Sequence, residues 1–316
     1  MLSRLKLLLL LASLAVFSLI YSLSKGSTPI SLYQLLFNED HEFISTIFLN
    51  VRLPRTFTAF IAGGLLALAG SLMQLLLQNP IADPYVLGIS GGAALVTLFG
   101  VLLGLGETSL MMSAWVGSLL SMLLILMFAR KHRFESSHLL LTGMAIACGF
   151  SACISFILIA SPADKLHSML FWLTGDLNDA RFSYASLMIL IAGFLISMLL
   201  APGLNILSRG DLEARALGLS LKRYRVIIYL LSSLFTGAAV ALAGCIGFVG
   251  LLVPHFSRLI AGFDYRITLP ASLFIGGTLV TLADTLARTL FAPVQIPVGI
   301  LLAFIGVPVF IWQLRQ

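Results

Sequence analysis

Charged residues are scarce in this sequence. Lys, Arg, Asp and Glu make up only 10% of its 316 residues, whereas 59% are hydrophobic. Soluble domains usually carry about 25% charged residues, so this composition excludes an ordinary soluble protein. A helix needs about 20 mainly apolar residues to cross the hydrocarbon core of a bilayer. The long uncharged runs therefore predict an all-α membrane protein.

Cysteines are few, and nucleotide-binding motifs are missing. Cys148, Cys153 and Cys245 fall in apolar runs without the paired spacing of a zinc or disulfide site, so we interpret them as packing residues. No Gly-Lys pair occurs, which excludes the GxxxxGK[ST] loop that holds nucleotide phosphates. No paired carboxylates or nucleophile-base motif suggests an enzyme. We therefore expect the chain itself to bind no cofactor or metal.

Ten apolar segments, separated by charges and helix breakers, are the candidate transmembrane helices. We place them at 7–24, 56–76, 85–104, 109–129, 138–160, 182–201, 225–245, 248–262, 267–290 and 297–313. The first follows Arg4 and Lys6 like a signal peptide, but its uncharged run continues to Ser24, which favours an uncleaved span. No polar connection is long enough for a separate soluble domain, so residues 1–316 are expected to form a single transmembrane domain.

Basic residues are unevenly divided between the connections. If the N-terminus lies inside, thirteen of the nineteen Lys and Arg residues lie on that same side of the membrane. Cytoplasmic loops carry such an excess of basic residues. With an even number of spans, both termini are then predicted to be cytoplasmic. This bias also explains the net charge of +6, and no nucleic-acid partner is needed to account for it.

Two runs of small residues suggest an internal repeat. Residues 63–70 read Gly-Gly-Leu-Leu-Ala-Leu-Ala-Gly and residues 237–244 read Gly-Ala-Ala-Val-Ala-Leu-Ala-Gly, and Pro80 and Pro254 each follow ten residues after their run. We interpret this as an inverted repeat of spans two to five on spans seven to ten. The alternative is that small residues recur at any tight helix contact. The prolines, with Pro84, also mark spans that stop short, which favours a translocation pathway.

The connection after the sixth span contains a short helix with defined ends. We expect Asp211 to be its N-cap, Glu213 to lie in its first turn and Gly218 to supply a left-handed stop. Two turns are too few for a stable isolated helix. Leu212 and Leu217 would need a groove on a partner to pack against. We predict partner docking, with a simple connecting loop as the alternative.

Two arginines precede the second span. Arg52 and Arg55 oppose the dipole of the helix that Pro54 begins, so an acidic group is expected to compensate. Lipid headgroups and a protein partner are both possible contacts. Asp284 is the one clear carboxylate inside a span, and Arg288 follows one turn later, which favours an internal salt bridge. An ion-coupled carrier would more often bury several such groups.

Distinctive motifs occur along nearly the whole chain. They are Arg52-Leu53-Pro54-Arg55, Asn79-Pro80-Ile81-Ala82-Asp83-Pro84, Phe171-Trp172, Gly210-Asp211, Ala216-Leu217-Gly218, Gly247-Phe248-Val249-Gly250-Leu251, Pro254-His255 and Pro297-Val298-Gly299. These motifs resemble those of the FecCD-like permeases of iron-siderophore, haem and cobalamin importers. The resemblance implies a type II ABC importer permease fold with ten spans in the bacterial inner membrane. It also implies a homodimer with the pathway at its interface, two ATP-binding cassette subunits that use ATP and Mg, and a periplasmic or lipid-anchored binding protein.

The resemblance assigns roles to individual residues. The helix that couples to the ATPase would consist of Asp211, Leu212, Glu213, Ala214, Arg215, Ala216, Leu217 and Gly218. Acidic residues of the binding protein would dock on Arg52, Arg55 and Arg288, which are expected to be exposed. Ser136 and Ser137 would form a cytoplasmic gate, with helix capping as the alternative.

The sequence does not determine which substrate is carried. The leading interpretation is a permease subunit that imports an iron chelate, either a siderophore or haem, with ATP hydrolysis in a separate subunit. A cobalamin importer is the alternative, and an ion-coupled secondary transporter is the third possibility. Gln295 departs from the family pattern, which usually has glutamate two residues before the Pro-x-Gly of the last connection. This change removes a negative charge beside the predicted docking surface.

Overall fold

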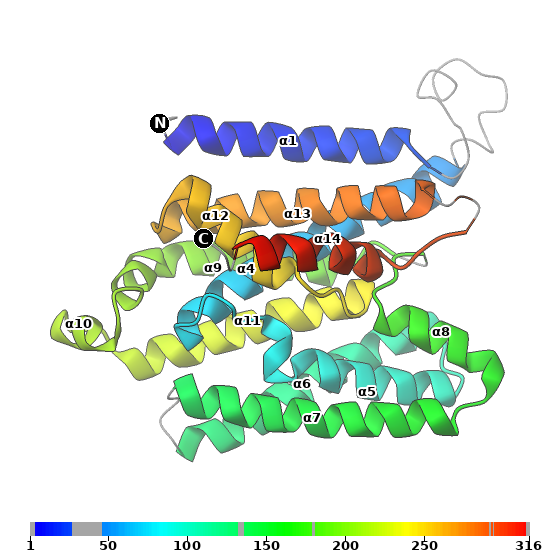
Figure 1. The fold of residues 1–316 in the computed structure, drawn as a ribbon, viewed down its shortest axis with the longest axis horizontal. Helices are drawn as coiled ribbons and strands as arrows, with labels where there is room; N and C mark the ends of the chain where they lie inside the picture. The colour runs from blue at the N-terminus through cyan, green and yellow to red at the C-terminus, as the bar shows by residue number, and fades with distance from the viewer. Residues whose placement is uncertain are drawn as a thin grey trace.

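The computed structural model describes residues 4–26, 46–131, 136–178, 181–290, 292 and 294–313. Within these residues every regular element is a helix, and most helices run along a common direction (Figure 1). Seven helices are long and apolar enough to cross a membrane, and three shorter apolar helices accompany them. These ten helices correspond in order to the ten predicted spans, so the predicted fold class is confirmed.

The bounds of the helices lie close to the predicted ones. In chain order the elements are α1 (Arg4–Ser24), the π-helix η1 (Phe48–Arg52), α4 (Leu53–Leu77), the 3-10 helix η2 (Pro84–Leu87), α5 (Ile89–Leu102), α6 (Glu107–Lys131), α7 (Ser136–Ala160), α8 (Ala163–Leu173), α9 (Tyr184–Leu207), α10 (Asp211–Ala216), α11 (Leu221–Ala243), α12 (Val249–Ala261), α13 (Tyr265–Thr289) and α14 (Val298–Gln313). With 14 and 13 residues, α5 and α12 are each only about 20 Å long, at about 1.5 Å per residue. They are shorter than a hydrocarbon core of about 30 Å, as the nearby breakers predicted.

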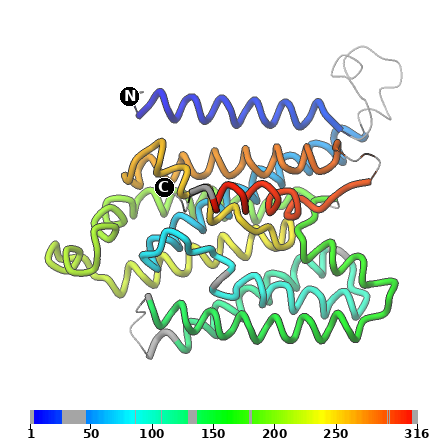
Figure 2. Tube along the Cα trace, in the orientation of Figure 1, coloured from blue at the N-terminus to red at the C-terminus, as the bar shows by residue number. Residues whose placement is uncertain are grey.

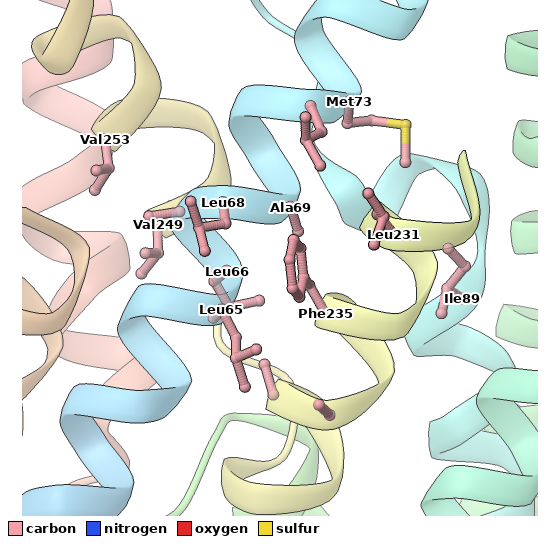
Figure 3. Packing of buried hydrophobic residues seen from close by; sticks show 14 of the residues in the cluster. Leu65, Leu66, Leu68, Ala69, Met73, Ile89, Leu231, Phe235, Val249 and Val253 are labelled. Carbon is pink, nitrogen blue, oxygen red and sulfur yellow. The ribbon is translucent and has the colours of Figure 1, made fainter. Parts of the chain in front are cut away.

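Helix α4 is the centre of the bundle. It packs against α13, α11 and α12, and almost all of its span is buried. Figure 3 shows Leu65, Ala69 and Met73 of α4 beside Leu231 and Phe235 of α11. Lipid tails are as apolar as these side chains, so close packing rather than escape from water favours the contact.

Glycines allow α4 to approach two neighbours more closely than any side chain would permit. A Cβ on Gly63 would lie 2.2 Å from the carbonyl oxygen of Gly276 in α13. A Cβ on Gly70 would lie 2.0 Å from the carbonyl oxygen of Gly250 in α12. The small-residue run of the second span is therefore a contact surface for two different helices.

The packing agrees with the predicted inverted repeat. Helix α4 packs on α13, and its counterpart α11 packs on α6, where a Cβ on Gly237 would lie 2.9 Å from Cβ of Ser118. Helices α4 and α11 run in opposite directions (Figure 2). The matching proline offset is not part of the repeat, because Pro80 lies between α4 and η2 whereas Pro254 lies inside α12. The repeat is therefore supported by helix packing and not by the prolines.

Helix α7 is the most exposed of the long helices. Only 11% of its spanning window is buried, compared with 94% for the segment Phe48–Leu77 that includes α4. Two of the three cysteines, Cys148 and Cys153, are exposed on this helix, so neither packs inside a single copy of the chain. Within a single copy of the chain, α7 therefore offers a large unpacked surface at membrane depth.

Candidate functional site

Two groups of polar residues lie at opposite ends of the bundle. At one end, which we call the arginine end, Arg55 begins α4 beside the last turns of α13. Its Nη2 and Nε donate to Oδ1 of Asp284 at 2.8 and 3.0 Å. Its Nη1 donates at 2.9 Å to the side-chain oxygens of both Asn178 and Gln295. Arg55 thus joins α4, α13 and the two connections that precede α9 and α14.

The other two predicted arginines belong to the same region. Nη2 of Arg288 donates to the carbonyl oxygen and the hydroxyl of Ser22 in α1, at 2.8 and 2.6 Å. Its Nε lies 3.7 Å from Oδ2 of Asp284, so the predicted salt bridge within α13 is confirmed. Nη1 of Arg52 donates to the carbonyl oxygen of Leu23 at 3.2 Å. The acidic group that compensates Arg55 is therefore Asp284.

The three arginine side chains at this end are buried. Arg52, Arg55 and Arg288 are only 4%, 6% and 4% exposed. The expectation that their side chains are exposed is wrong, because each is turned inward toward hydrogen-bond acceptors of the bundle. Their docking to a binding protein is a separate prediction. The guanidinium groups of Arg55 and Arg288 share the buried carboxylate of Asp284, so these two cations outnumber that counter-charge among the described residues.

A cavity adjoins the arginine end. It has a volume of about 430 Å³ and is lined by residues of α5, α6, α8, α11 and the connection that follows α8. Phe171 and Trp172 supply aromatic walls, whereas His167 and Arg181 supply polar groups. Asn178 both lines this cavity and accepts the hydrogen bond from Arg55. The arginine cluster and the cavity are therefore directly connected.

Helix α10 lies at the opposite end, which we call the coupling end (Figure 1). Leu212 and Leu217 are 84% and 61% exposed, whereas Ala214 is fully buried. Gly218 has φ of +79°, and its N–H donates to Arg215 O, while the N–H of the next residue donates to Ala214 O. These two bonds form a Schellman motif, so the predicted left-handed stop is confirmed. The two leucine side chains therefore face outward.

The beginning of α10 differs from the prediction. The N-cap is Gly210, with φ of +110°, and Asp211 is the first residue of the helix. The carboxylate of Asp211 makes no cap and instead accepts a hydrogen bond from Arg225 of α11. The N-cap assignment is therefore wrong, because the charge of a buried arginine attracts the carboxylate away from the helix end.

A second polar group joins α9 to α13 at the coupling end. Nδ2 of Asn205 donates to Oδ1 of Asp264 at 2.8 Å, and N–H of Tyr265 donates to Oδ1 of Asn205 at the same distance. The bond from Asn205 is the main cause that holds the pKa of Asp264 below its usual value. Asp264 also caps α13 and forms an ion pair with Arg4 of α1.

From the sequence, Arg225 is only one of the thirteen basic residues expected on the cytoplasmic side. Its position does carry a signal, since Leu221, Ile228 and Tyr229 lie four residues before it and three and four residues after it. This spacing places Arg225 on the buried apolar face of α11. A cation on such a face needs a partner.

The predicted gate lies where α7 begins. Ser136 is the first residue of α7, and its side chain lies outside what the structure describes. Ser137 follows it and is exposed. Both serines are thus at the start of the most exposed long helix, and their role as a gate stays a prediction.

The comparisons with known proteins agree with this geometry. Residues 12–316 match the model of the FecCD transport family. The chain belongs to the FecCD transport family. Members of the FecCD family are transport subunits of ABC importers, whose ATPase is a separate subunit. The chain is accordingly a multi-pass membrane permease and not an enzyme.

Individual relatives support the assignment over nearly the full length. The chain is 38% identical over 304 residues to the hemin transport system permease protein HmuU of Yersinia pestis, covering 93% of this chain and 91% of that one. It is 35% identical over 313 residues to the vitamin B12 import system permease protein BtuC of Shigella boydii, covering 98% and 94%. A solved inward-facing metal-chelate type ABC transporter superposes with a TM-score of 0.87 at 31% identity, covering 99% of this chain and all of that one.

Proposed function

We propose that this FecCD-family chain imports an iron chelate, haem or a siderophore, across the bacterial inner membrane. The observation that carries the proposal is its 38% identity, over 93% of its length, to a hemin permease. The likeness to a metal-chelate type transporter supports the same class of cargo. Cobalamin is the alternative cargo, favoured by the 35% identity to a vitamin B12 permease over 98% of the chain.

An ion-coupled carrier is the less favoured mechanism. Such carriers place ionisable groups where an ion or proton can reach them. Asp284 is instead 1% exposed and is held by the guanidinium of Arg55. We therefore assign the energy source to two ATP-binding cassette subunits, which use ATP and Mg, and no cofactor or metal to this chain.

The ATPase subunits would dock at the coupling end. Leu212 and Leu217 offer an apolar contact, and the exposed cations Arg209 and Arg215 lie close to them in the chain. The same cations favour a cytoplasmic position for this end. Helix α1 begins here, and α14 runs back toward it from Gln295 at the arginine end, so both termini would be cytoplasmic (Figure 1).

The remaining partners would contact other parts of the bundle. A periplasmic or lipid-anchored binding protein would dock at the arginine end, on Arg52, Arg55 and Arg288, where the guanidinium groups of Arg55 and Arg288 share the carboxylate of Asp284. A second copy of the chain would pack along α7, and lipid would cover the outer helices. Ser136 and Ser137 would then lie at the cytoplasmic exit of a pathway between the two copies.

The proposal is tested by reconstituting the permease in lipid nanodiscs with its ATPase and binding protein. Binding protein loaded with haemin or a ferric siderophore is expected to stimulate ATP hydrolysis, and binding protein incubated with cyanocobalamin is not. Stimulation by cyanocobalamin alone would establish the alternative cargo. Transport that follows a proton gradient without ATP would contradict both.

A further inference from the structure

The coupling helix is attached to the bundle by an ion pair whose arginine is buried. Nη2 of Arg225 donates to Oδ2 of Asp211, fourteen positions earlier in the chain. The Arg225 side chain is only 7% exposed, whereas that of Asp211 is 32% exposed. Arg225 lies in the first turns of α11, so the pair joins the start of α10 directly to the start of α11. We call this pair the α10 clamp.

The helices on either side of α10 are fixed to each other. A Cβ on Gly203 of α9 would lie 2.2 Å from the hydroxyl oxygen of Tyr224 in α11, so the tyrosine packs directly against the backbone of α9. The reciprocal hydrogen bonds of Asn205 attach the same end of α9 to the start of α13. The connections around α10 therefore begin and end on helices that form one packed unit.

Helix α11 runs from the clamp to the cavity at the opposite end. Its 23 residues span about 35 Å at about 1.5 Å per residue, which is enough to cross the membrane. At its far end Ala241, Leu242 and Gly244 line the cavity beside the arginine cluster. The N–H of Cys245 donates there to the carbonyl oxygen of Trp172 at 3.4 Å. A displacement of α11 would therefore move one wall of that cavity.

We propose that Arg225 is a positioning residue that makes α10 and α11 move as one body. This inference rests on the proposed function, because it concerns how force from the ATPase reaches the cavity. The two faces of α10 make different contacts. Leu212 and Leu217 face outward toward the partner, whereas Asp211 faces Arg225. The partner thus holds α10 from outside, and the clamp transmits its movement to α11.

The chemistry of the pair suits this role better than an apolar contact would. Separating a buried arginine from its carboxylate strongly destabilises the fold, so the two charges do not separate easily. Apolar contacts of the leucines on the outer face are instead non-directional. A displacement of α10 would then move α11 before the ion pair between Asp211 and Arg225 breaks.

The experiment uses the complete complex of permease, ATPase and binding protein in nanodiscs, with Arg225→Met as the test variant. Arg223→Met is the matched control, because Arg223 is exposed and lies in the same turn. The readout is the ratio of ATP hydrolysis with binding protein to ATP hydrolysis without it. We expect this ratio to fall about tenfold in R225M, within the usual range of coupling between sites, and to stay at the wild-type value in R223M.

A merely structural role would leave that ratio unchanged once attachment of the ATPase and thermal stability are matched. If R225M does not assemble, the exchanged pair D211R/R225D replaces it, and recovery of at least half of the wild-type ratio supports the clamp. A wild-type ratio in assembled R225M, or a low ratio in an assembled exchange variant, overturns the inference. Absence of stimulation in the wild-type complex would instead contradict the proposed function.

Discussion

At the scale of single residues, the arginine end depends on one carboxylate. Asp284 is 1% exposed and lies against Arg55 and Arg288, with Arg52 nearby. The sequence could predict its bond to Arg288, because the two residues are one helical turn apart. It could not predict the bond to Arg55, because 229 positions separate the two residues and only the packing of α4 on α13 brings them together.

Replacing Asp284 should be strongly destabilising. Asp284→Asn leaves Arg55 and Arg288 buried without a counter-charge, and breaking such a pair typically costs about 3–5 kcal/mol. Thermal unfolding of the purified permease in detergent measures this as a clear drop in Tm. Arg4→Gln is the control, because it breaks an ion pair whose arginine is 75% exposed and should change Tm little. Equal melting of D284N and the wild type would contradict the electrostatic account.

A carboxylate can also be added to this region, at Gln295. Its Oε1 accepts a hydrogen bond from Nη1 of Arg55 at 2.9 Å, in a region with more guanidinium groups than buried carboxylates among the described residues. Gln295→Glu should therefore strengthen this contact and raise the free energy of unfolding by about 1–2 kcal/mol, as for hydrogen bonds to charged groups. Gln78→Glu, which adds the same charge at an exposed position, should not do so. A lower Tm for Q295E would show that the region does not need a second carboxylate.

At the scale of secondary-structure elements, α10 depends on its glycine stop. Gly218→Val places a branched side chain at φ of +79°, where it costs about 1–3 kcal/mol of backbone strain. The end of α10 should unwind and displace Leu217, so less ATPase should co-purify while the spans remain folded. Gly104→Val is the control, because Gly104 has φ of +72° and also lies in a connection without close neighbours. Full ATPase recovery with G218V would argue against docking through α10.

Most elements could be predicted from the sequence because uncharged runs of about 20 residues have few alternatives to a spanning helix. The bounds were less accurate where a breaker was involved. The predicted sixth span stops at Ala201, whereas α9 continues through Pro202 to Leu207. Proline removes a single hydrogen bond of the helix, and α9 continues past it, which the local sequence does not reveal. The predicted N-cap of α10 is wrong for a similar reason. Arg225 lies fourteen residues after Asp211, so the local sequence does not reveal that it binds the carboxylate of Asp211.

At the scale of the whole molecule, the two ends of the bundle are linked by long, closely packed helices. Helix α4 carries Arg55 at one end, and α11 carries Arg225 at the other. Close glycine contacts fix α4 to α13 and α12. These packed helices form a continuous structure between the two ends, whereas α7 is far less buried.

The exposed surface of α7 should be covered by a second copy of the chain. A Cβ on Gly149 would have no neighbour within 4 Å among the described residues, and Ala145, Cys148 and Ala152 are exposed nearby. Small residues on a membrane helix let a second backbone approach closely, and most homo-oligomers are two-fold dimers. Gly149→Trp should therefore convert the permease from two copies to one.

Native mass spectrometry of the detergent-solubilised permease measures the number of copies directly. Leu199→Trp is the matched control, because Leu199 is 81% exposed on α9, outside the small-residue surface of α7. We expect L199W to remain a dimer, since a large side chain facing lipid displaces no protein. A dimeric G149W would place the interface on another helix. Ser136 and Ser137, at the start of α7, would then no longer face a pathway between two copies, and the proposed gate would fail with the interface.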